Sequence, residues 1–424
     1  MNPTDQTSFS VPRLDDYVLQ VREWLAAHLD RRVGPREAHA DIGFYTPEVM
    51  ATARRLQRSV FEAGYAGITW PRQFGGQGLP KEYEWAFNQE AADYLMPDFG
   101  LLAETTFETC VPTMLQHAEP AFLEWFVPQV LRGEALVCQF FSEPSAGSDL
   151  AAARTRATND GDEWVIAGQK TWSSYAQLAD WGMCLARTDF DVPKHQGLTW
   201  FAVPCNAPGL TVRPIRQITG ATEFCEEFFD DVVVPDAYRI SDLNDGWAVA
   251  QTMLVLERGA GGSRSGAPLG PPGPLAPDLV EVARLARRLN DPVARQKIAQ
   301  AHTNDFVERA LKSRVGELDR LGLLNAGVAA YVKLFAGTYN PVRARLAIEI
   351  GGAAAMAWQP DDVDGAAVSQ AYLDGRRLSI AGGTNEVQRN AISERALGMP
   401  REKSADTKVP FSQALRNAAN WGSQ

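Results

Sequence analysis

The chain has 424 residues and a formal net charge of −11, with 45% hydrophobic and 22% charged residues. This composition is typical of a folded globular protein and excludes a disordered chain, and the length allows two or three domains or one large layered unit. The acidic balance disfavours nucleic acid and anionic membranes as partners, because phosphate groups are bound by basic surfaces.

Neither a membrane helix nor a signal peptide is predicted. No run approaches the roughly 18 consecutive apolar residues that a membrane span needs, and the start, MNPTDQTSFSVPRLDD, has no basic or apolar leader region. The 5 cysteines are dispersed without a C-x-x-C pair, and no H-E-x-x-H motif occurs. We therefore expect a cytoplasmic protein with reduced thiols and no metal site.

Residues 1–133 are predicted to form a helical domain. Apolar side chains recur three and four positions apart in two long segments, LDDYVLQVREWLAAHLD from residue 14 and PEVMATARRLQRSVFEAGY from residue 47. The segment ITWPRQFGGQGLP, residues 68–80, is rich in glycine and proline and is expected to be a loop between helices.

Residues 134–240 are predicted to form a middle β-domain, an antiparallel sheet or barrel. Its β-type runs are EWVIAGQKTW, WGMCLART, LTWFAVP and LTVRPI, separated by turn sequences such as NDGD and NAPG. Residues 241–400 return to a helical pattern, in GWAVAQTMLVLER, FVERALKSRVGELDRL and AAYVKLFAGTYNPVRARLAIEI, and residues 401–424 form a polar tail, either an arm or disordered. Two helical blocks that flank a small sheet leave crevices for a flat ligand.

The turn between the first helical block and the sheet is a candidate ligand site. It reads FFSEPSAGSD, residues 140–149, in which small residues let the backbone approach a ligand and hydroxyls and amides bind a ring edge or a phosphate. Trp172 and Ser174 follow on a predicted strand, where an indole beside a hydroxyl can pack on a flat ring and donate to its edge. Taken alone, a serine- and glycine-rich turn is more often only a turn.

Three motifs occur in order: SEPSAGSD, GQKTWSS, and GGTNEVQR with the ending ERALGMP. Together they resemble the acyl-CoA dehydrogenase family, and the resemblance covers nearly the whole chain, including GITWPRQFGGQGLP and GLTVRPI. It implies a mainly α fold with a central β-domain: an N-terminal helical domain, an antiparallel β-barrel or sandwich, and a C-terminal four-helix bundle. It also implies an acyl-CoA substrate and FAD bound between subunits.

The resemblance assigns roles to individual residues. Those that it places at the flavin are Gln139, Phe140, Phe141, Ser142, Gly147, Ser148, Trp172 and Ser174. Ser142 would reach the pyrimidine end, Trp172 and Ser174 would lie near N5, and Ser148 would also approach the thioester. Thr384 and Glu386 match positions that hold the pyrophosphate and adenosine side of FAD. For each residue alone, packing within the β-domain or a turn is the alternative.

The base of such an enzyme is missing from its commonest position. α,β-Dehydrogenation needs a base for the α-proton, flavin N5 as hydride acceptor, and hydrogen bonds to the thioester carbonyl. Many family members supply the base as a glutamate directly before the G-T of the last motif. This sequence reads IAGGT there, so that position is Gly382. Either the chain is not catalytic, or its carboxylate comes from another element.

Glu257 is the candidate base. It lies on a helix predicted to begin near Asp245, on a face that is otherwise apolar: Trp247, Ala250, Met253 and Leu254. The apolar face and the helix C-terminus both disfavour a negative charge, which raises the carboxyl pKa toward that of a general base. The alternative is a salt bridge to a neighbouring arginine. The L-E-R placement resembles isovaleryl-CoA and long-chain acyl-CoA dehydrogenases, which carry their base on this helix.

By the same resemblance, the backbone N–H of Gly382 would donate to the thioester oxygen, with Ser148, Leu254, Arg258 and Gly383 on the substrate side. Two family features are absent. An R-x-x-F-G motif that contacts FAD of the neighbouring subunit is replaced by DPVARQ, in which Arg295 is a substitute, and Ile348 stands where a glutamine is expected. These departures fit a divergent homodimer or homotetramer, or one chain of a heterotetramer whose related subunit completes the flavin site.

The leading hypothesis is FAD-dependent oxidation of an acyl-CoA to the trans-2-enoyl-CoA in lipid β-oxidation, with an electron-transfer flavoprotein as acceptor. A base on this helix is compatible with branched or bulky acyl groups. The Gly/Pro-rich loop at residues 259–274 is either a surface connector or a binding loop that widens the pocket. The alternatives are a related flavin oxidase or monooxygenase, and a weakly catalytic subunit of a hetero-oligomeric dehydrogenase.

Overall fold

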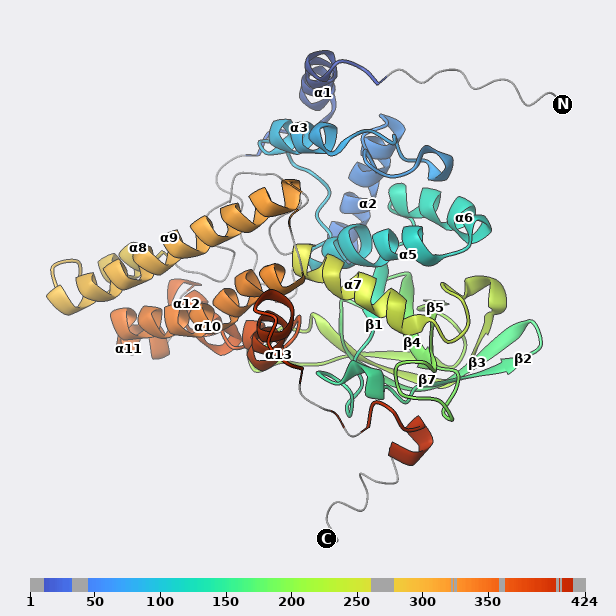
Figure 1. Ribbon diagram of the computed structural model, residues 1–424. Helices are drawn as coiled ribbons and strands as arrows, with labels where there is room; N and C mark the ends of the chain where they lie inside the picture. The colour runs from blue at the N-terminus through green and yellow to red at the C-terminus, as the bar shows by residue number, and fades with distance from the viewer. Residues whose placement is uncertain are drawn as a thin grey trace, which may run out of the picture.

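The computed structural model describes residues 11–32, 45–260, 278–321, 323, 326–357, 363–401, 404 and 406–414. Helices, a sheet and helices again follow one another along the chain, in the order expected from the sequence (Figure 1). The helix α7 (Gly246–Ala260) runs where these blocks meet, in contact with helices of the first block, with the sheet and with α10 of the last block.

The first block packs helices against the sheet. Its elements are α1 (Leu14–His28), α2 (Pro47–Glu62), η1 (Arg72–Phe74), α3 (Lys81–Ala91), α4 (Leu101–Ala103), η2 (Glu104–Cys110), α5 (Val111–His117) and α6 (Pro120–Leu131). α2 begins at Pro47, a residue that suits the first turn of a helix. The Thr46 hydroxyl caps this turn by accepting a hydrogen bond from the Val49 N–H. Both periodic segments of the sequence are confirmed as helices.

Within the described residues, the middle block is a 7-stranded sheet. Its strands are β1 (Val137–Phe140), β2 (Arg156–Asp160), β3 (Glu163–Ser174), β4 (Trp181–Arg187), β5 (Leu198–Pro204), β6 (Leu210–Pro214) and β7 (Phe224–Pro235). Their order is β1-β4-β2-β3-β7-β6, with β5 paired to β4. The longest ladder joins β3 to β7.

The sheet is not purely antiparallel. β1 pairs in parallel with β4, with Val137 opposite Trp181, because the chain passes through the β2–β3 hairpin before it returns beside β1. β2 also meets β4 in parallel, at Arg156 and Arg187. The other ladders are antiparallel, as expected. β7 was not among the runs that the sequence pattern singled out, because doubled acidic and aromatic residues interrupt its alternation (FCEEFFDDVVVP).

The last block is the expected helical bundle. After α7 it contains α8 (Leu279–Leu285), α9 (Pro292–Arg320), α10 (Ala326–Gly351), α11 (Ala353–Met356), α12 (Val363–Asp374) and α13 (Asn385–Ala391). α10 is its central helix, because it packs on each of the others. Buried Leu346, Ala347 and Ile350 of α10 form its core with α8 and α12. No helix in the described ranges is both long and apolar enough to cross a membrane.

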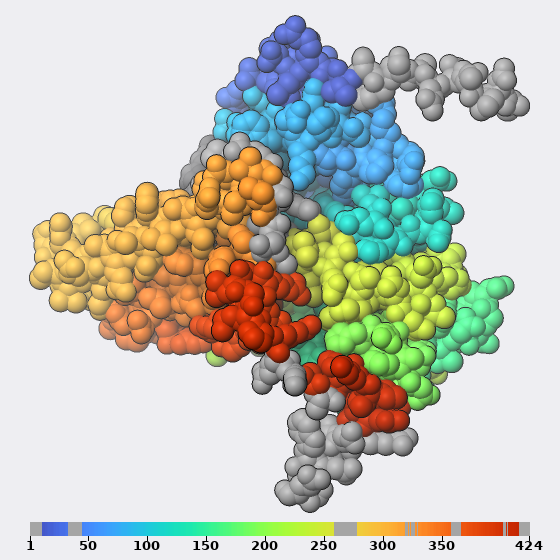
Figure 2. Space-filling model, viewed as in Figure 1, coloured from blue at the N-terminus to red at the C-terminus, as the bar shows by residue number. Residues whose placement is uncertain are grey.

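Part of the polar tail is an arm that packs on the β-domain (Figure 2). Phe411 is 2% exposed, and its ring lies against the guanidinium of Arg187, 3.8 Å from the ring centroid. Arg187 is fully buried at the end of β4 and donates to the carbonyls of Ala151 and Ala153. The ring therefore covers a buried cation whose donors hold the segment after the 140–149 turn.

The same arm is tied to that turn by charge. Lys194 Nζ donates to Asp149 Oδ2 at 2.8 Å and to Asp406 Oδ2 at 2.7 Å. Asp149 is the last residue of the SEPSAGSD motif, and Asp406 belongs to the arm. One ammonium thus links the C-terminal arm to the turn that the sequence indicates as a ligand site.

We expect Phe411→Ala to lower the free energy of unfolding by about 3 kcal/mol, because it leaves a cavity beside a buried guanidinium. Thermal unfolding followed by circular dichroism measures the change. Ser412→Ala is the matched control, since it loses one exposed hydrogen bond to Asp191 and should cost less than about 0.5 kcal/mol. Equal stability of the two variants would show that the arm does not complete the core.

Candidate active site

The loop before α13 faces the last turn of α7. An ideal Cβ built on Gly382 would lie 3.5 Å from Glu257 Oε1 and 3.2 Å from Lys333 Cε. A carboxylate from α7 is therefore beside the point where a side chain at residue 382 would begin. The structure brings together the two residues that the sequence singled out for acid–base chemistry, and it adds a lysine from α10.

The backbone of this loop requires glycine. Gly382 and Gly383 have φ angles of +64° and +88°, which side chains rarely tolerate. Gln388 is fully buried and its Nε2 donates to the carbonyls of Gly382 (2.9 Å) and Gly383 (3.2 Å). Lys333 Nζ donates to the carbonyl of Leu378 at the start of the loop. Side chains from α10 and α13 thus fix the direction in which the backbone amides of the loop point.

The electrostatic surroundings of Glu257 are asymmetric. Burial lowers the pKa of Lys333, and the Glu257 carboxylate opposes that shift. On another side, burial raises the pKa of the Cys110 thiol in η2, and Glu257 adds to the rise. Leu254, one turn earlier on α7, is partly buried, and Met253 beside it is fully buried. The carboxylate therefore lies between an apolar wall and one ammonium group.

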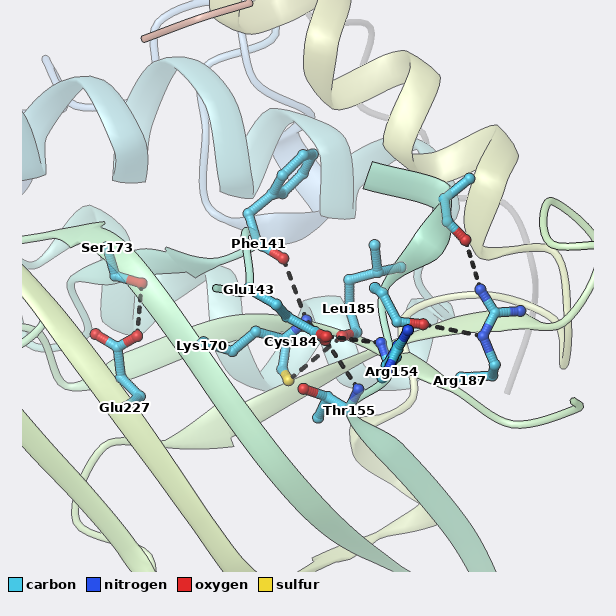
Figure 3. Close-up of polar contacts among 12 residues, drawn as sticks. Phe141, Glu143, Arg154, Thr155, Lys170, Ser173, Cys184, Leu185, Arg187 and Glu227 are labelled. Atoms are coloured by element: carbon cyan, nitrogen blue, oxygen red, sulfur yellow. Dashed lines mark hydrogen bonds and ion pairs between the residues drawn. The ribbon is translucent and has the colours of Figure 1, made fainter. Parts of the chain in front are cut away.

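A buried ion pair holds the 140–149 turn (Figure 3). The Glu143 carboxylate accepts from the N–H groups of Arg154 (2.7 Å) and Thr155 (2.8 Å) and from Lys170 Nζ (2.8 Å). Lys170 is fully buried and also donates to the carbonyl of Phe141 at 3.2 Å. Burial alone would raise the pKa of Glu143, but Lys170 and the backbone donors hold it below its ordinary value.

The turn presents its accessible side to solvent. Gly147 and Ser148 are exposed, and a Cβ on Gly147 would meet nothing within 4 Å. Ser142 and Phe141 are partly buried. Such an open stretch of small residues leaves the backbone free for close approach by a ligand.

The two residues at the end of β1 point to different sides. Phe140 packs into the β-domain core, edge-on to Phe229, with ring centroids 5.5 Å apart. Its side chain is therefore not available to a ligand, which could contact only its backbone. Gln139 points to the opposite side. Its Nε2 is buried and has no hydrogen-bond partner among the described residues. A buried amide donor without a partner marks a place where a polar ligand atom fits.

β3 carries a bulge at Trp172. The register with β7 shifts between Thr171 and Ser173, and Trp172 has a φ of +70°. Its side chain is 58% exposed, and Ser174 beyond it is partly buried. A bulky residue in the left-handed region is strained, and such strain concentrates at functional sites. The exposed indole is a platform for a flat ring.

Two further predicted residues lie on α13. Thr384 caps this helix, with its hydroxyl accepting from the Val387 N–H at 3.2 Å. Glu386 is exposed in the first turn and pairs with Arg389 at 3.3 Å. Both residues therefore follow directly on the Gly382–Gly383 loop, at the end of the bundle that adjoins the sheet (Figure 1).

The structure does not bring Arg295 to this site. It is exposed in the first turn of α9, at the end of the bundle remote from the β-domain (Figure 1). The side chain of Arg258 lies outside the described residues, as does most of the loop at residues 259–274.

Sequence reasoning missed the residues that support the site. Glu143 and Lys170 were inside the quoted motifs, but nothing in the sequence showed that they pair. Lys333 is a lone cation in the apolar run AAYVKLFAG, and this isolation was an available signal. Nothing in the sequence indicated a role for Gln388, because that role depends on the path of the Gly382–Gly383 loop, which precedes it in the chain.

Helical blocks on either side of a sheet, with an exposed indole beside an open turn, are features that suit a flat cofactor with a polar edge. The chain matches the acyl-CoA dehydrogenase N-terminal domain over residues 16–134, the middle domain over 138–232 and the C-terminal domain over 244–397. It therefore belongs to the acyl-CoA dehydrogenase family, whose members are FAD-dependent oxidoreductases.

Relatives extend over nearly the whole chain. Acyl-CoA dehydrogenase IpdE1 of Mycobacterium tuberculosis is 35% identical over 401 residues, 92% of this chain and 98% of that protein. Acyl-CoA dehydrogenase FadE34 of the same organism is 36% identical over 382 residues, 85% of this chain and 50% of that protein. The ChsE4-ChsE5 complex from Mycobacterium tuberculosis has a TM-score of 0.69 at 26% identity, covering 94% of this chain and 100% of that chain. The Tcur3481-Tcur3483 steroid ACAD has a TM-score of 0.70 at 26% identity, covering 93% and 99%.

The residues present fit FAD. The Gln139 amide needs a polar partner, the Gly147 backbone is open to close approach, and the Trp172 indole is exposed on a strained backbone. The amide suits the polar edge of a flavin ring, the open backbone suits the chain attached to the ring, and the indole suits the face of the ring. Within the described ranges, no group of His, Cys, Asp and Glu side chains could hold a metal ion.

We expect Lys170→Met to lower the free energy of unfolding at pH 7 by about 3–5 kcal/mol, because Glu143 remains buried without its cation. The pKa of Glu143 is depressed in the folded protein, so the pair stabilises above the unfolded pKa of about 4.3 and less as pH falls through the folded value. Without Lys170, burial raises the pKa of Glu143, so the carboxyl of the variant takes up a proton in the folded state as the pH falls, and the deficit of the variant should shrink between pH 7 and pH 4 in urea titrations. Adding Glu143→Gln should restore part of the lost stability, and an unchanged midpoint in Lys170→Met alone contradicts the role of the pair.

Proposed function

We propose that this chain oxidises an acyl-CoA thioester to the trans-2-enoyl-CoA with Glu257 as the catalytic base. The observation that carries the proposal is the approach of Glu257 Oε1 to within 3.5 Å of the position that a Cβ on Gly382 would take. A carboxylate on α7 occupies the space that a side chain at residue 382 would enter, so a carboxylate and a loop amide converge without a glutamate at 382.

FAD supplies the hydride acceptor when bound. Glu257 removes the α-proton, and the Gly382 N–H donates to the thioester oxygen as negative charge develops there. Gln388 and Lys333 hold the loop by its carbonyls, so this donor is oriented before the substrate arrives. Leu254, Gly383 and Ser148 would contact the acyl chain and the thioester, with Arg258 toward the CoA.

The flavin would lie on the β-domain side of the site. Gln139 and the 140–148 backbone would meet its polar edge, and the hydroxyls of Ser142 and Ser174 would donate to it. Trp172 would cover the ring. Thr384 and Glu386 would lie toward the pyrophosphate and adenosine. The orphaned Gln139 amide and the exposed Trp172 indole support this arrangement.

We propose a branched or alicyclic acyl group as the substrate. Relatives include a steroid ACAD among the solved structures and cyclohexane-1-carbonyl-CoA dehydrogenases among the curated proteins, and their acyl groups are bulky rings. A base on α7 approaches the α-carbon from the bundle side and leaves the loop at 382–383 free of side chains. We further propose a cytoplasmic enzyme that acts in lipid β-oxidation and passes its electrons to an electron-transfer flavoprotein.

The flavin site would be completed by a second chain, in a dimer or tetramer. Arg295 is exposed at the end of α9 remote from the β-domain, so it can reach only the flavin of another subunit. The structure of the ChsE4-ChsE5 complex joins two different chains. A heterotetramer with a related subunit is therefore the second candidate beside a homotetramer, and each accommodates the missing R-x-x-F-G motif.

We expect Glu257→Gln to retain FAD but to lose at least about 1000-fold in the rate of flavin bleaching by acyl-CoA, because an amide cannot accept the α-proton. Anaerobic loss of visible absorbance in a stopped-flow instrument measures this rate. Glu281→Gln removes an exposed carboxylate paired with Arg284 on α8 and serves as the control with unchanged rate.

The same assay with an acyl-CoA panel tests the substrate. Cyclohexanoyl-CoA and branched acyl-CoAs should bleach the flavin faster than butyryl-CoA. Bleaching by short straight chains alone would refute a bulky substrate, and full activity of Glu257→Gln would favour an oxidase or monooxygenase that needs no substrate base.

We expect Lys333→Met to move the acidic limb of the pH profile of kcat/KM to higher pH. The base must be deprotonated, and the Lys333 cation lowers the pKa of a nearby carboxyl, so its removal raises that pKa. Lys333→Arg keeps the charge and should keep the limb near its original pH. A uniform loss of rate without movement of the limb would mean that Lys333 acts only by holding the Leu378 carbonyl.

A further inference from the structure

A second carboxylate is buried behind the strand that carries Trp172. Glu227 of β7 is 0% exposed, and its Oε2 accepts a hydrogen bond of 2.9 Å from Ser173 Oγ (Figure 3). Its Oε1 is buried and has no hydrogen-bond partner among the described residues. No step of the dehydrogenation proposed above uses this group.

The cation nearest to Glu227 is already engaged. Lys170 lies opposite Glu227 in the β3–β7 register, and neighbouring residues in register point to the same face of a sheet. Lys170 donates to Glu143 and to the Phe141 carbonyl. The single charge of Lys170 is therefore shared between two carboxylates, and the buried guanidinium of Arg187 at the end of β4 acts on Glu143, so Glu227 has no cation of its own when both acids are ionised.

The other titratable groups around Glu227 do not compensate it. They come from β1, β4 and β7: Cys138, Cys184, Cys225 and Glu226. Burial raises the pKa of Glu227 to about 7, against the Ser173 hydrogen bond and the Lys170 cation, and Glu226 adds to the rise. The three thiols have raised pKa values and stay neutral. Glu227 thus changes charge near neutral pH while its neighbours do not.

Ser173 connects this acid to the proposed flavin platform. It lies between Trp172 and Ser174, at the bulge where β3 leaves its register with β7. Because successive side chains of a strand point to opposite faces, Ser173 points into the core while its two neighbours point away from it. Glu227 is therefore separated from the platform by the thickness of one strand, in a region of low dielectric.

We propose that Glu227 takes up a proton from solvent when the flavin of this enzyme is reduced, so that reduction and protonation of the β-domain core are coupled. The inference rests on the proposed placement of the flavin against Trp172 and Ser174. The substrate delivers two electrons and one proton to the flavin as a hydride, and its α-proton goes to Glu257. One further proton passes from solvent to the Glu227 carboxylate, and it returns to solvent when the acceptor removes the electrons.

The physical reason is repulsion between buried negative charges. The reduced flavin carries more negative charge than the oxidised flavin, and the nearby ionised carboxylate destabilises it. Protonation of Glu227 relieves that repulsion, so reduction raises the proton affinity of the carboxyl. Below neutral pH the group is protonated in both states. Above neutral pH, reduction is accompanied by the uptake of up to one proton per flavin at Glu227. This uptake ends at the pH where the carboxyl stays ionised in the reduced enzyme as well.

Anaerobic potentiometry of the FAD-loaded enzyme from pH 6 to 9 tests the coupling. For a two-electron couple, each accompanying proton adds about 30 mV per pH unit to the slope of the midpoint potential. We expect the wild type to be steeper than Glu227→Gln above pH 7 by up to that amount, and parallel to it below. The wild-type potential should therefore be the lower of the two at pH 8–9. Superimposable slopes across the range would overturn the proposal.

Two variants separate proton uptake from a purely structural role. Ser173→Ala removes the hydrogen bond that lowers the pKa of Glu227, so the steeper region should begin at higher pH. Glu226→Gln, next to Glu227 on the same strand but partly exposed, should keep the steeper slope. Loss of that slope in Glu226→Gln, or an unchanged onset in Ser173→Ala, would contradict the assignment to Glu227.

A measurement on the wild type keeps the proposal testable if Glu227→Gln does not fold. Photoreduction in weakly buffered solution at pH 7.5 with an indicator dye should show more protons taken up per flavin than at pH 6. Equal uptake at the two pH values would overturn the coupling. If acyl-CoA bleaches the flavin but proton uptake is equal at the two pH values, the proposed function stands and the coupling does not. A protein that binds no FAD would overturn the proposed function and the coupling together.

Discussion

The buried pair between Glu143 and Lys170 is the interaction on which the turn at residues 140–149 depends. It joins the turn after β1 to the middle of β3, and the same carboxylate fixes the backbone at Arg154 and Thr155. Desolvation of the two charges offsets much of their attraction, so the pair fixes the geometry of the turn more than it adds to the free energy of folding. Its consequence is that the charge of Lys170 is shared between Glu143, which it contacts, and Glu227, which it does not, so an ordinary structural contact leaves an acid in an unusual environment one strand away.

In the proposed mechanism the base and the loop amide come from different segments, and this separation has a structural consequence. When one residue supplies both, its side chain and its backbone must be oriented by the same pair of dihedral angles. Here Glu257 is oriented by a helix, while Gly382 is oriented by Gln388 and by the left-handed backbone that glycine permits. The two groups can then be adjusted independently, because a change in α7 need not disturb the loop.

Much of the architecture could be predicted, because the spacing of apolar residues along the sequence indicates its helices and strands. The helical patterns at residues 14 and 47 and the β-type runs after residue 160 became elements close to the expected bounds. β7 was missed, because paired glutamates and aromatics mask its alternation. For the site, the resemblance to the acyl-CoA dehydrogenase family was needed to relate Gly382 to Glu257 on a distant segment, and the apolar face before Glu257 supported that relation. Lys333, Gln388 and the Glu143–Lys170 pair were not predictable, since each depends on where a distant backbone passes.

The C-terminal arm has a consequence for how the protein matures. Phe411 covers the buried guanidinium of Arg187, and Asp406 shares Lys194 with Asp149. The β-domain is encoded between the two helical blocks, yet the ring that covers its buried guanidinium comes from residue 411, which is synthesised after both blocks. Until residue 406 is synthesised, Lys194 has Asp149 but not Asp406 as a partner, so the turn at residues 140–149 lacks its link to the arm. The wall that the arm adds to β4 and to the loop after it therefore joins the β-domain later than every strand of the sheet.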